Sequence, residues 1–252
     1  EIDRFSSGLD WIKHVIRLTD MVQFGRGHTA GLLPNTKLAE VINELVDNRS
    51  FDELPFDCAV VAADIDRKAR VIITSRRVAE RLDRGELESF LPPRAEHKPG
   101  LETIVLSDVE DVGLAVRASC AVPGIFRAVK IHDLNLVDGG IVDQTPTDIV
   151  RAMGAEFSIA VSLALSFTPP KMVNAFQAIS GTIAILGNPQ LRRAIELADI
   201  GFEVSGIEAR SPVQPGQLDL IGIGEADMAR ELNQCFGRFL DRNAPSRHST
   251  GT

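Results

Sequence analysis

The elements on which the predicted fold depends lie within residues 114–148, LAVRASCAVPGIFRAVKIHDLNLVDGGIVDQTPTD. Its first residues have the composition of a helix, and the pair Pro123-Gly124 breaks that helix. Two extended arms follow, at residues 126–131 and 134–137, with a polar turn between them. The sequence therefore predicts a helix that leads into two consecutive strands.

The second arm ends at an acidic residue, Asp138, which stands directly before Gly139 and Gly140. Two glycines permit backbone angles that are closed to other residues, so the chain can turn sharply without covering the carboxylate. An aspartate held at a strand end beside bare backbone is suited to meet a substrate or a neighbouring hydroxyl. Asp-Gly is also a common turn dipeptide, and a plain turn is the simpler interpretation of the motif alone. A helix is expected behind residues 145–147, where a threonine hydroxyl can cap it and Pro146 suits its first turn.

The chain before this stretch predicts a helix and a hairpin. Residues 37–46 place their apolar side chains on one helical face. Residues 58–63 form a continuous apolar run, typical of a strand buried on both faces, and residues 69–75 form a second strand. Asp64 and Asp66 stand between the two strands; a metal or catalytic role is open to them, but a hairpin turn explains them more simply.

Further elements complete an α/β order. Ser107-Asp108 is expected to cap the helix that ends at residue 118, and residues 157–163 read as another buried strand. Strands that alternate with helices suit a parallel sheet. The prediction is a three-layer α/β domain with a mostly parallel central sheet and helices on both faces.

Length and composition limit the functions open to the chain. Its 252 residues are enough for one large domain, expected to span residues 1–242, followed by a polar, disordered tail at 243–252. The net charge of −8 argues against nucleic acid as a partner and gives no general attraction to anionic membranes. No apolar run approaches the roughly 20 residues that span a bilayer, although an apolar face that touches lipid stays open.

Three widely spaced cysteines, Cys58, Cys120 and Cys235, show no spacing of a zinc site. Because Cys58 and Cys120 stand in apolar surroundings, both are expected to be buried free thiols. Free thiols favour a reducing compartment, and the expected location is the cytoplasm, with peripheral membrane contact left open.

Several segments together resemble the bacterial patatin-like phospholipases. Arg-Ala-Ser-Cys-Ala-Val-Pro-Gly-Ile-Phe at residues 117–126, Leu-Val-Asp-Gly-Gly at 136–140 and Pro146 are similar to the second half of that family's domain. Gly-Leu-Leu at residues 31–33, with Lys-Leu after it, and Ala-Val-Val-Ala-Ala-Asp-Ile at 59–65 fit the same family. The resemblance covers most of residues 31–165.

The resemblance implies a reaction and one catalytic residue. In this family a serine in a Gly-x-Ser-x-Gly elbow attacks a fatty acyl ester, an aspartate of an Asp-Gly-Gly motif activates it, and a glycine-rich loop binds the oxyanion. Only the aspartate carries over, to Asp138, with Gly139 and Gly140 completing its motif; substrate-binding residues are not assigned, and no cofactor or metal is implied. Because the chain contains no Gly-x-Ser-x-Gly and no run of three glycines, we expect that the N-terminal strands, loop and elbow are missing from it.

One segment has the glycine spacing of the nucleophile elbow. Gly27-His28-Thr29-Ala30-Gly31 reads Gly-x-Thr-x-Gly, in which Thr29 would replace serine. An elbow needs a buried strand before it and a helix after it, whereas a helical pattern precedes Thr29 and Pro34 follows it closely. The same glycines are the sole support for a nucleotide-binding interpretation, and they lack the Lys-Ser/Thr ending of a phosphate loop.

The sequence thus predicts the aspartate-bearing part of a lipid acyl hydrolase with a Ser-Asp dyad, inactive on its own. The expected partner is a lipid ester substrate, and the oligomeric state is not indicated. The alternative is a non-catalytic patatin-like domain that binds lipid or protein.

Overall fold

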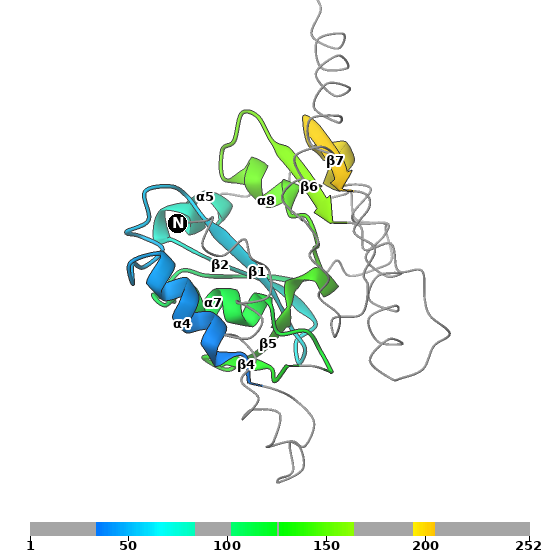
Figure 1. Ribbon diagram of the computed structural model, residues 1–252. Coiled ribbons are helices and arrows are strands. Elements are labelled where there is room, and N and C mark those ends of the chain that lie inside the picture. Colours follow the sequence, from blue (N-terminus) through cyan, green and yellow to red (C-terminus); the bar gives the residue numbers. More distant parts are fainter. Residues whose placement is uncertain (1–33, 84–101, 125, 164–193, 205–252) are drawn as a thin grey trace, which may run out of the picture.

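The protein is seen here in a computed structural model that describes residues 34–83, 102–124, 126–163 and 194–204, arranged around a five-stranded sheet (Figure 1). The strands lie in the order β3-β2-β1-β5-β4. Their bounds are β1 (Ala59–Asp64), β2 (Ala69–Thr74), β3 (Glu102–Leu106), β4 (Val129–Ile131) and β5 (Leu134–Asp138). Because β1 and β5 are neighbours, the sheet joins the first hairpin to the segment that ends in Asp138.

The sheet is mixed. The expected hairpin of β1 and β2 is confirmed, with Ala59 opposite Thr74 and Asp64 opposite Ala69, and β4 and β5 form a second antiparallel pair. β1 and β5 are also antiparallel, whereas β2 and β3 run parallel. The α/β class is confirmed, but the described strands do not form a mostly parallel sheet, because short turns can join only antiparallel neighbours.

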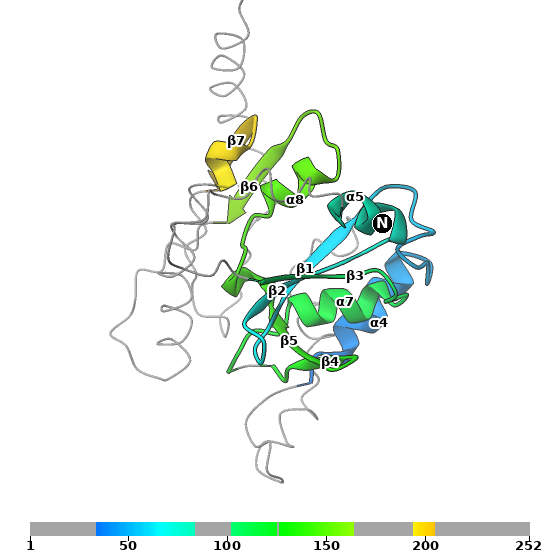
Figure 2. The same ribbon diagram turned by 180° about the vertical axis from the view of Figure 1, so that it is seen from behind.

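Helices cover both faces of the sheet, as the sequence predicts. α4 (Thr36–Leu45) and α7 (Val112–Ser119) lie together on one face, and α5 (Arg76–Arg81) and α8 (Thr147–Ala152) lie on the other (Figures 1 and 2). The sheet and its two helical layers are the three layers that the sequence predicts.

The interior strand β2, between β3 and β1, shows why both faces are covered. Its side chains alternate: Val71 and Ile73 pack in the cluster under α7, and Ile72 packs in the cluster under α5 and α8. All three are fully buried. Burial of each such side chain contributes about 1.5–3 kcal/mol, so an apolar run on both faces stabilises a three-layer arrangement.

The two helices of the first layer approach each other closely at Gly113. A β-carbon at this position would lie 2.2 Å from the carbonyl oxygen of Ala39 on α4. The Asn43 side chain of α4 also accepts a hydrogen bond from the Gly113 amide, at 2.7 Å. Glycine is therefore required at the crossing of α4 and α7.

Two expected helix caps are wrong. α7 begins at Val112, and its cap is Asp111, whose carboxylate accepts from the Leu114 amide at 2.7 Å; residues 107–108 lie before the helix. α8 has Pro146 in the capping position and no side-chain hydrogen bond there, so neither threonine hydroxyl caps it.

A second, two-stranded parallel sheet joins β6 (Ile159–Leu163) and β7 (Ile200–Val204). β6 confirms a strand within residues 157–163, but the expectation that this strand is buried is wrong, because the side chains of Ile159 and Val161 are exposed. The expected domain end at residue 242 and the tail at 243–252 lie outside the described residues. None of the described helices has the length and apolar character needed to cross a membrane.

Candidate active site

Asp138 is the last residue of β5, in the sheet beside β1. It stands opposite Ala62, and its amide donates to the carbonyl of Ala121, just beyond the end of α7, at 3.1 Å. Because residues opposite each other in a ladder share a face, the Asp138 side chain lies on the α7 face of the sheet, where Ala62 packs. The side chain is half-buried. The strand end and the end of α7 thus place one carboxylate at the margin of the core.

The two glycines after Asp138 form a short 3-10 helix, η2 (Gly139–Ile141). Neither glycine has a positive φ, so the expectation that they supply unusual backbone angles is wrong. Residue 139 must be glycine because there is no space for a side chain: a β-carbon there would lie 2.1 Å from the carbonyl oxygen of Val61 on β1. At Gly140 a β-carbon would lie 3.0 Å from Oδ1 of Asp138. The motif brings the turn against β1 and leaves the carboxylate uncrowded.

One oxygen of the Asp138 carboxylate is held by the protein. Oδ1 accepts a hydrogen bond from the Gly140 amide at 2.7 Å. Among the residues that the structure describes, no basic side chain and no hydroxyl is bonded to the other oxygen, Oδ2. Burial raises the pKa of Asp138 above its ordinary value, and the Gly140 hydrogen bond opposes that rise. The carboxylate is thus a stronger base than a solvated aspartate, and its Oδ2 is without a partner in the part of the chain that the structure describes.

Cys120 lies near this carboxylate, at the end of α7. Desolvation of its thiol raises the pKa, and the negative charge of Asp138 raises it further. A thiol with a raised pKa is a poor nucleophile at neutral pH. The residue as a whole is exposed, and Cys58 is only partly buried, so the expectation of two buried thiols is wrong; Cys235 lies outside the described residues.

The other strand-end aspartate, Asp64, organises a turn. It is 2 % exposed, and its Oδ1 accepts hydrogen bonds from the amides of Asp66 at 3.3 Å and Asn135 at 3.2 Å. Asp66 in turn accepts from the side chain of Asn135. Within the described ranges no three His, Cys, Asp or Glu side chains are grouped as metal ligands. The turn interpretation of Asp64 and Asp66 is confirmed.

A buried ionic cluster near the motif was missed by sequence reasoning. Arg70 of β2 donates from Nη1 to Oδ2 of Asp143 and to Oδ2 of Asp148, both at 2.8 Å. Burial raises the pKa of Asp143, and the charge of Asp148 adds to the rise, while Arg70 opposes it. A signal was present, because an arginine inside the apolar strand Ala69–Thr74 requires a buried partner.

Arg117 forms a hydrogen bond with the side-chain amide of Asn35. This arginine belongs to the segment that carries the family resemblance. Its Nε donates to Oδ1 of Asn35 at 3.0 Å, and the Asn35 side chain donates to the Arg117 carbonyl at 2.9 Å. Desolvation lowers the pKa of Arg117, and the charge of Asp111 opposes this. The pair fixes the segment before α4 to α7.

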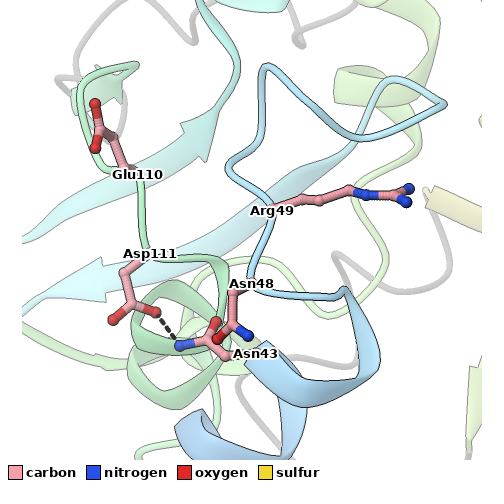
Figure 3. A pocket seen from close by; sticks show the side chains of 5 residues that line it. All are labelled: Asn43, Asn48, Arg49, Glu110 and Asp111. Atoms are coloured by element: carbon pink, nitrogen blue, oxygen red, sulfur yellow. Dashed lines mark hydrogen bonds between the residues drawn. The ribbon is translucent and has the colours of Figure 1, made fainter.

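An open polar pocket of about 220 Å³ lies at the opposite end of α7 from Asp138 (Figure 3). It is lined by Asn43, Asn48, Arg49, Glu110 and Asp111. Asn43 and Asp111 point toward each other and are bonded at 2.8 Å, so much of the lining serves the cap of α7. This pocket is separate from Asp138, and an open cleft at Asp138 stays a prediction. Thr29 and its flanking glycines lie outside the described residues.

The fold and the site define an α/β protein with a partly buried carboxylate at a strand end. The sequence model of the family described as patatin-like phospholipase matches residues 6–151, more than half of the chain. The chain therefore belongs to the patatin-like phospholipase family. Asp138, Gly139 and Gly140 lie within the matched residues.

Curated relatives agree with this assignment. Uncharacterized NTE family proteins from two strains of Mycobacterium tuberculosis and one of Mycobacterium bovis are each 25% identical over 134 residues. The alignments cover 53% of this chain and 28% of each relative. The chain thus matches less than a third of the length of these relatives.

Proposed function

We propose that this chain supplies the general base of a serine ester hydrolase that acts on lipids, and that Asp138 is this base. The proposal rests on the hydrogen bonding and burial of the Asp138 carboxylate. Its Oδ1 is held by the Gly140 amide, its Oδ2 has no partner among the described residues, and burial raises its pKa. The family match adds the class of reaction.

The reaction requires two proton transfers, one from the serine hydroxyl to Asp138 and one from Asp138 to the leaving group. Oδ2 of ionised Asp138 accepts the proton of a serine hydroxyl while the serine oxygen bonds to the ester carbonyl carbon. The bond from that carbon to the leaving alkoxide then breaks, and the proton passes to the alcohol. Water repeats the sequence on the acyl serine. A pKa above that of a solvated aspartate makes the ionised carboxylate a stronger base for the serine proton.

The proposal assigns only the aspartate of the dyad to these residues. No Gly-x-Ser-x-Gly occurs in residues 1–252, and no run of three glycines that would supply an oxyanion loop. Losing a single oxyanion donor typically costs about 3–4 kcal/mol of transition-state stabilisation. Residues 1–252 alone are therefore expected to have no useful esterase activity.

Labelling with a fluorophosphonate, which reacts with activated serines, tests the proposal. The full-length polypeptide that contains these residues should be labelled stoichiometrically, and Asp138→Asn should slow the labelling. Asp133→Asn is the matched control, because Asp133 is an exposed aspartate in the β4–β5 turn. Equal labelling of Asp138→Asn and the unchanged protein would refute Asp138 as the base. Stoichiometric labelling of residues 1–252 alone would place the nucleophile within them.

The proposed substrate is a lipid ester, reached by peripheral contact with a membrane from the cytoplasm. The family supports the substrate class. The net charge of −8 gives the chain no general attraction to anionic lipid, so contact would depend on a local apolar surface. Sedimentation with neutral and anionic vesicles tests this; binding that increases with anionic lipid would contradict it.

A second candidate is a non-catalytic patatin-like domain that binds lipid or protein. The observation in its favour is the lack of a Gly-x-Ser-x-Gly motif in residues 1–252. The same labelling experiment separates the two functions. If the full-length polypeptide takes up no fluorophosphonate, the non-catalytic function is the correct one.

A further inference from the structure

A buried arginine holds the loop that follows the Asp-Gly-Gly motif. Arg70 is 6 % exposed and lies in the middle of the sheet, opposite Ala63 of β1. Its two acidic partners come from the other side of the motif: Asp143 lies between η2 and α8, and Asp148 lies in the first turn of α8. One guanidinium thus connects β2 to both ends of the loop at residues 143–148.

The loop is connected to the carboxylate of Asp138 by backbone hydrogen bonds. The amide of Asp143 donates to the carbonyl of Gly139 at 2.8 Å, and the amide of Val142 donates to the same carbonyl at 3.0 Å. The next amide, that of Gly140, donates to Oδ1 of Asp138. A displacement of Asp143 therefore changes the position of the group that orients the Asp138 carboxylate.

The strand register places Arg70 and Asp138 on opposite faces of the sheet. Arg70 is opposite Ala63, and Ala63 is opposite Val137, the residue before Asp138. Since successive side chains of a strand point to opposite faces, Arg70 lies on the α8 face and Asp138 on the α7 face. The arginine cannot contact a substrate at Asp138 through the sheet and can act only through the loop.

We propose that Arg70 is a positioning residue which, through Asp143, fixes the Gly139–Gly140 backbone and so orients the Asp138 carboxylate. The inference rests on the proposed function for the role of Asp138, while the contacts that carry it are independent of any activity. Removal of the arginine would leave two buried carboxylates without their shared cation, which is strongly destabilising.

The geometry predicts which substitutions preserve the contact. A single nitrogen, Nη1, makes both bonds, whereas Nη2 is buried without a hydrogen-bond partner among the described residues. A lysine ammonium can donate to two carboxylates from one nitrogen, so Arg70→Lys should preserve the function of the cluster. Asp143→Asn keeps an acceptor for Arg70, whereas Asp143→Ala removes it and leaves the arginine paired with Asp148. Asp143→Ala is therefore the variant that releases the loop and still folds.

Amide hydrogen exchange on the full chain tests the proposal. In Asp143→Ala the amides of Gly140 and Val142 should exchange roughly tenfold faster, as expected for the loss of about one hydrogen bond. The amides of Ile72 and Ile73 should keep their protection. Because the Gly140 hydrogen bond holds the pKa of Asp138 down, its loss should move the titration of the Asp138 side-chain carboxyl resonance to higher pH.

Three variants should match the unchanged protein in both measurements: Arg70→Lys, Asp143→Asn and Arg151→Met. Arg151 of α8 pairs with Asp199 at 2.7 Å, so it controls for the loss of an ion pair on the same helix. Unchanged exchange at Gly140 and Val142 in Asp143→Ala would overturn the proposal. Faster exchange across β1 and β2 as well would also overturn it, because that pattern indicates a general loss of stability. A full-length polypeptide that fails to react with fluorophosphonate would refute the proposed function and leave these measurements unaffected.

Discussion

Two neighbouring strands, β1 and β5, each end in an aspartate, and the two side chains are held in different ways. Asp64 is 2 % exposed, and its Oδ1 accepts one backbone hydrogen bond from Asp66 in the β1–β2 turn and one from Asn135 of β5. Asp138 is half-buried, and its Oδ1 accepts one backbone hydrogen bond. Residue type and strand position therefore do not distinguish a structural carboxylate from the one that we propose as the general base. Exposure and the number of backbone donors do.

The largest effect should come from Asp138, the proposed general base. In the full-length polypeptide, Asp138→Asn should lower kcat for lipid ester hydrolysis by about 100- to 10,000-fold, because the amide cannot accept the serine proton. Steady-state hydrolysis of a lysophospholipid measures this. Asp133→Asn should leave kcat within about twofold of the value for the unchanged protein. Full activity of the Asp138→Asn protein would show that Asp138, like Asp64, has no role as a base.

The second effect concerns the structural carboxylate. Asp64→Ala should lower the free energy of unfolding by about 2–4 kcal/mol, because the amides of Asp66 in the turn and of Asn135 in β5 lose their acceptor. Urea denaturation followed by circular dichroism measures the loss. Asp138→Ala is the comparison, and it should cost less, since one amide loses its acceptor and the site is partly solvated. Equal losses would contradict the contrast between the two turns.

A smaller effect should come from the close approach of η2 to β1. Gly139→Ala should lower stability by about 1–3 kcal/mol, because the β-carbon would overlap the Val61 carbonyl and the turn must move away from β1. Thermal denaturation measures it. Gly140→Ala meets only the Asp138 side chain at 3.0 Å and should cost less. The reverse order of the two losses would show that space at Val61 is not the reason for the first glycine.

The smallest effect should be a gain in stability. Because burial raises the pKa of Asp138, folded protein binds that proton more tightly than unfolded protein, so the ionised carboxylate destabilises the fold above the ordinary pKa of 3.8. Asp138→Asn keeps an acceptor for Gly140 and should be more stable than the unchanged protein near neutral pH. The difference should vanish as the pH falls below that ordinary value. Urea denaturation at several pH values measures it, and a loss of stability at neutral pH would contradict the direction of the shift.

Much of this arrangement is predictable from local patterns. The apolar run at residues 58–63, the second strand and the polar turn between them specify the first hairpin, because burial and turn chemistry are read within a few residues. The Asp-Gly-Gly motif singles out Asp138 through its resemblance to a family, and the catalytic role of this residue stays a prediction. Strand directions across the sheet do not follow from such patterns, since the pairing of β1 with β5 joins residues far apart in the chain.

Interactions between distant segments account for the other differences. Asp111 caps α7 in place of residues 107–108 because Asn43 of α4 bonds to it and to the first turn of the helix. Gly139 is required by the Val61 carbonyl, which no local rule could supply. The partners of Arg70 lie more than 70 residues away, so the sequence indicated that a partner is needed and not which one.

The pKa of the Asp138 carboxyl group, measured by carbon-detected NMR titration of the folded chain, tests the central claim most directly. The pKa should lie above the ordinary value of 3.8, and the chemical shift of the Gly140 amide should change as Asp138 titrates. A pKa at or below that value would show a solvated or ion-paired carboxylate and would contradict the assignment of Asp138 as a base.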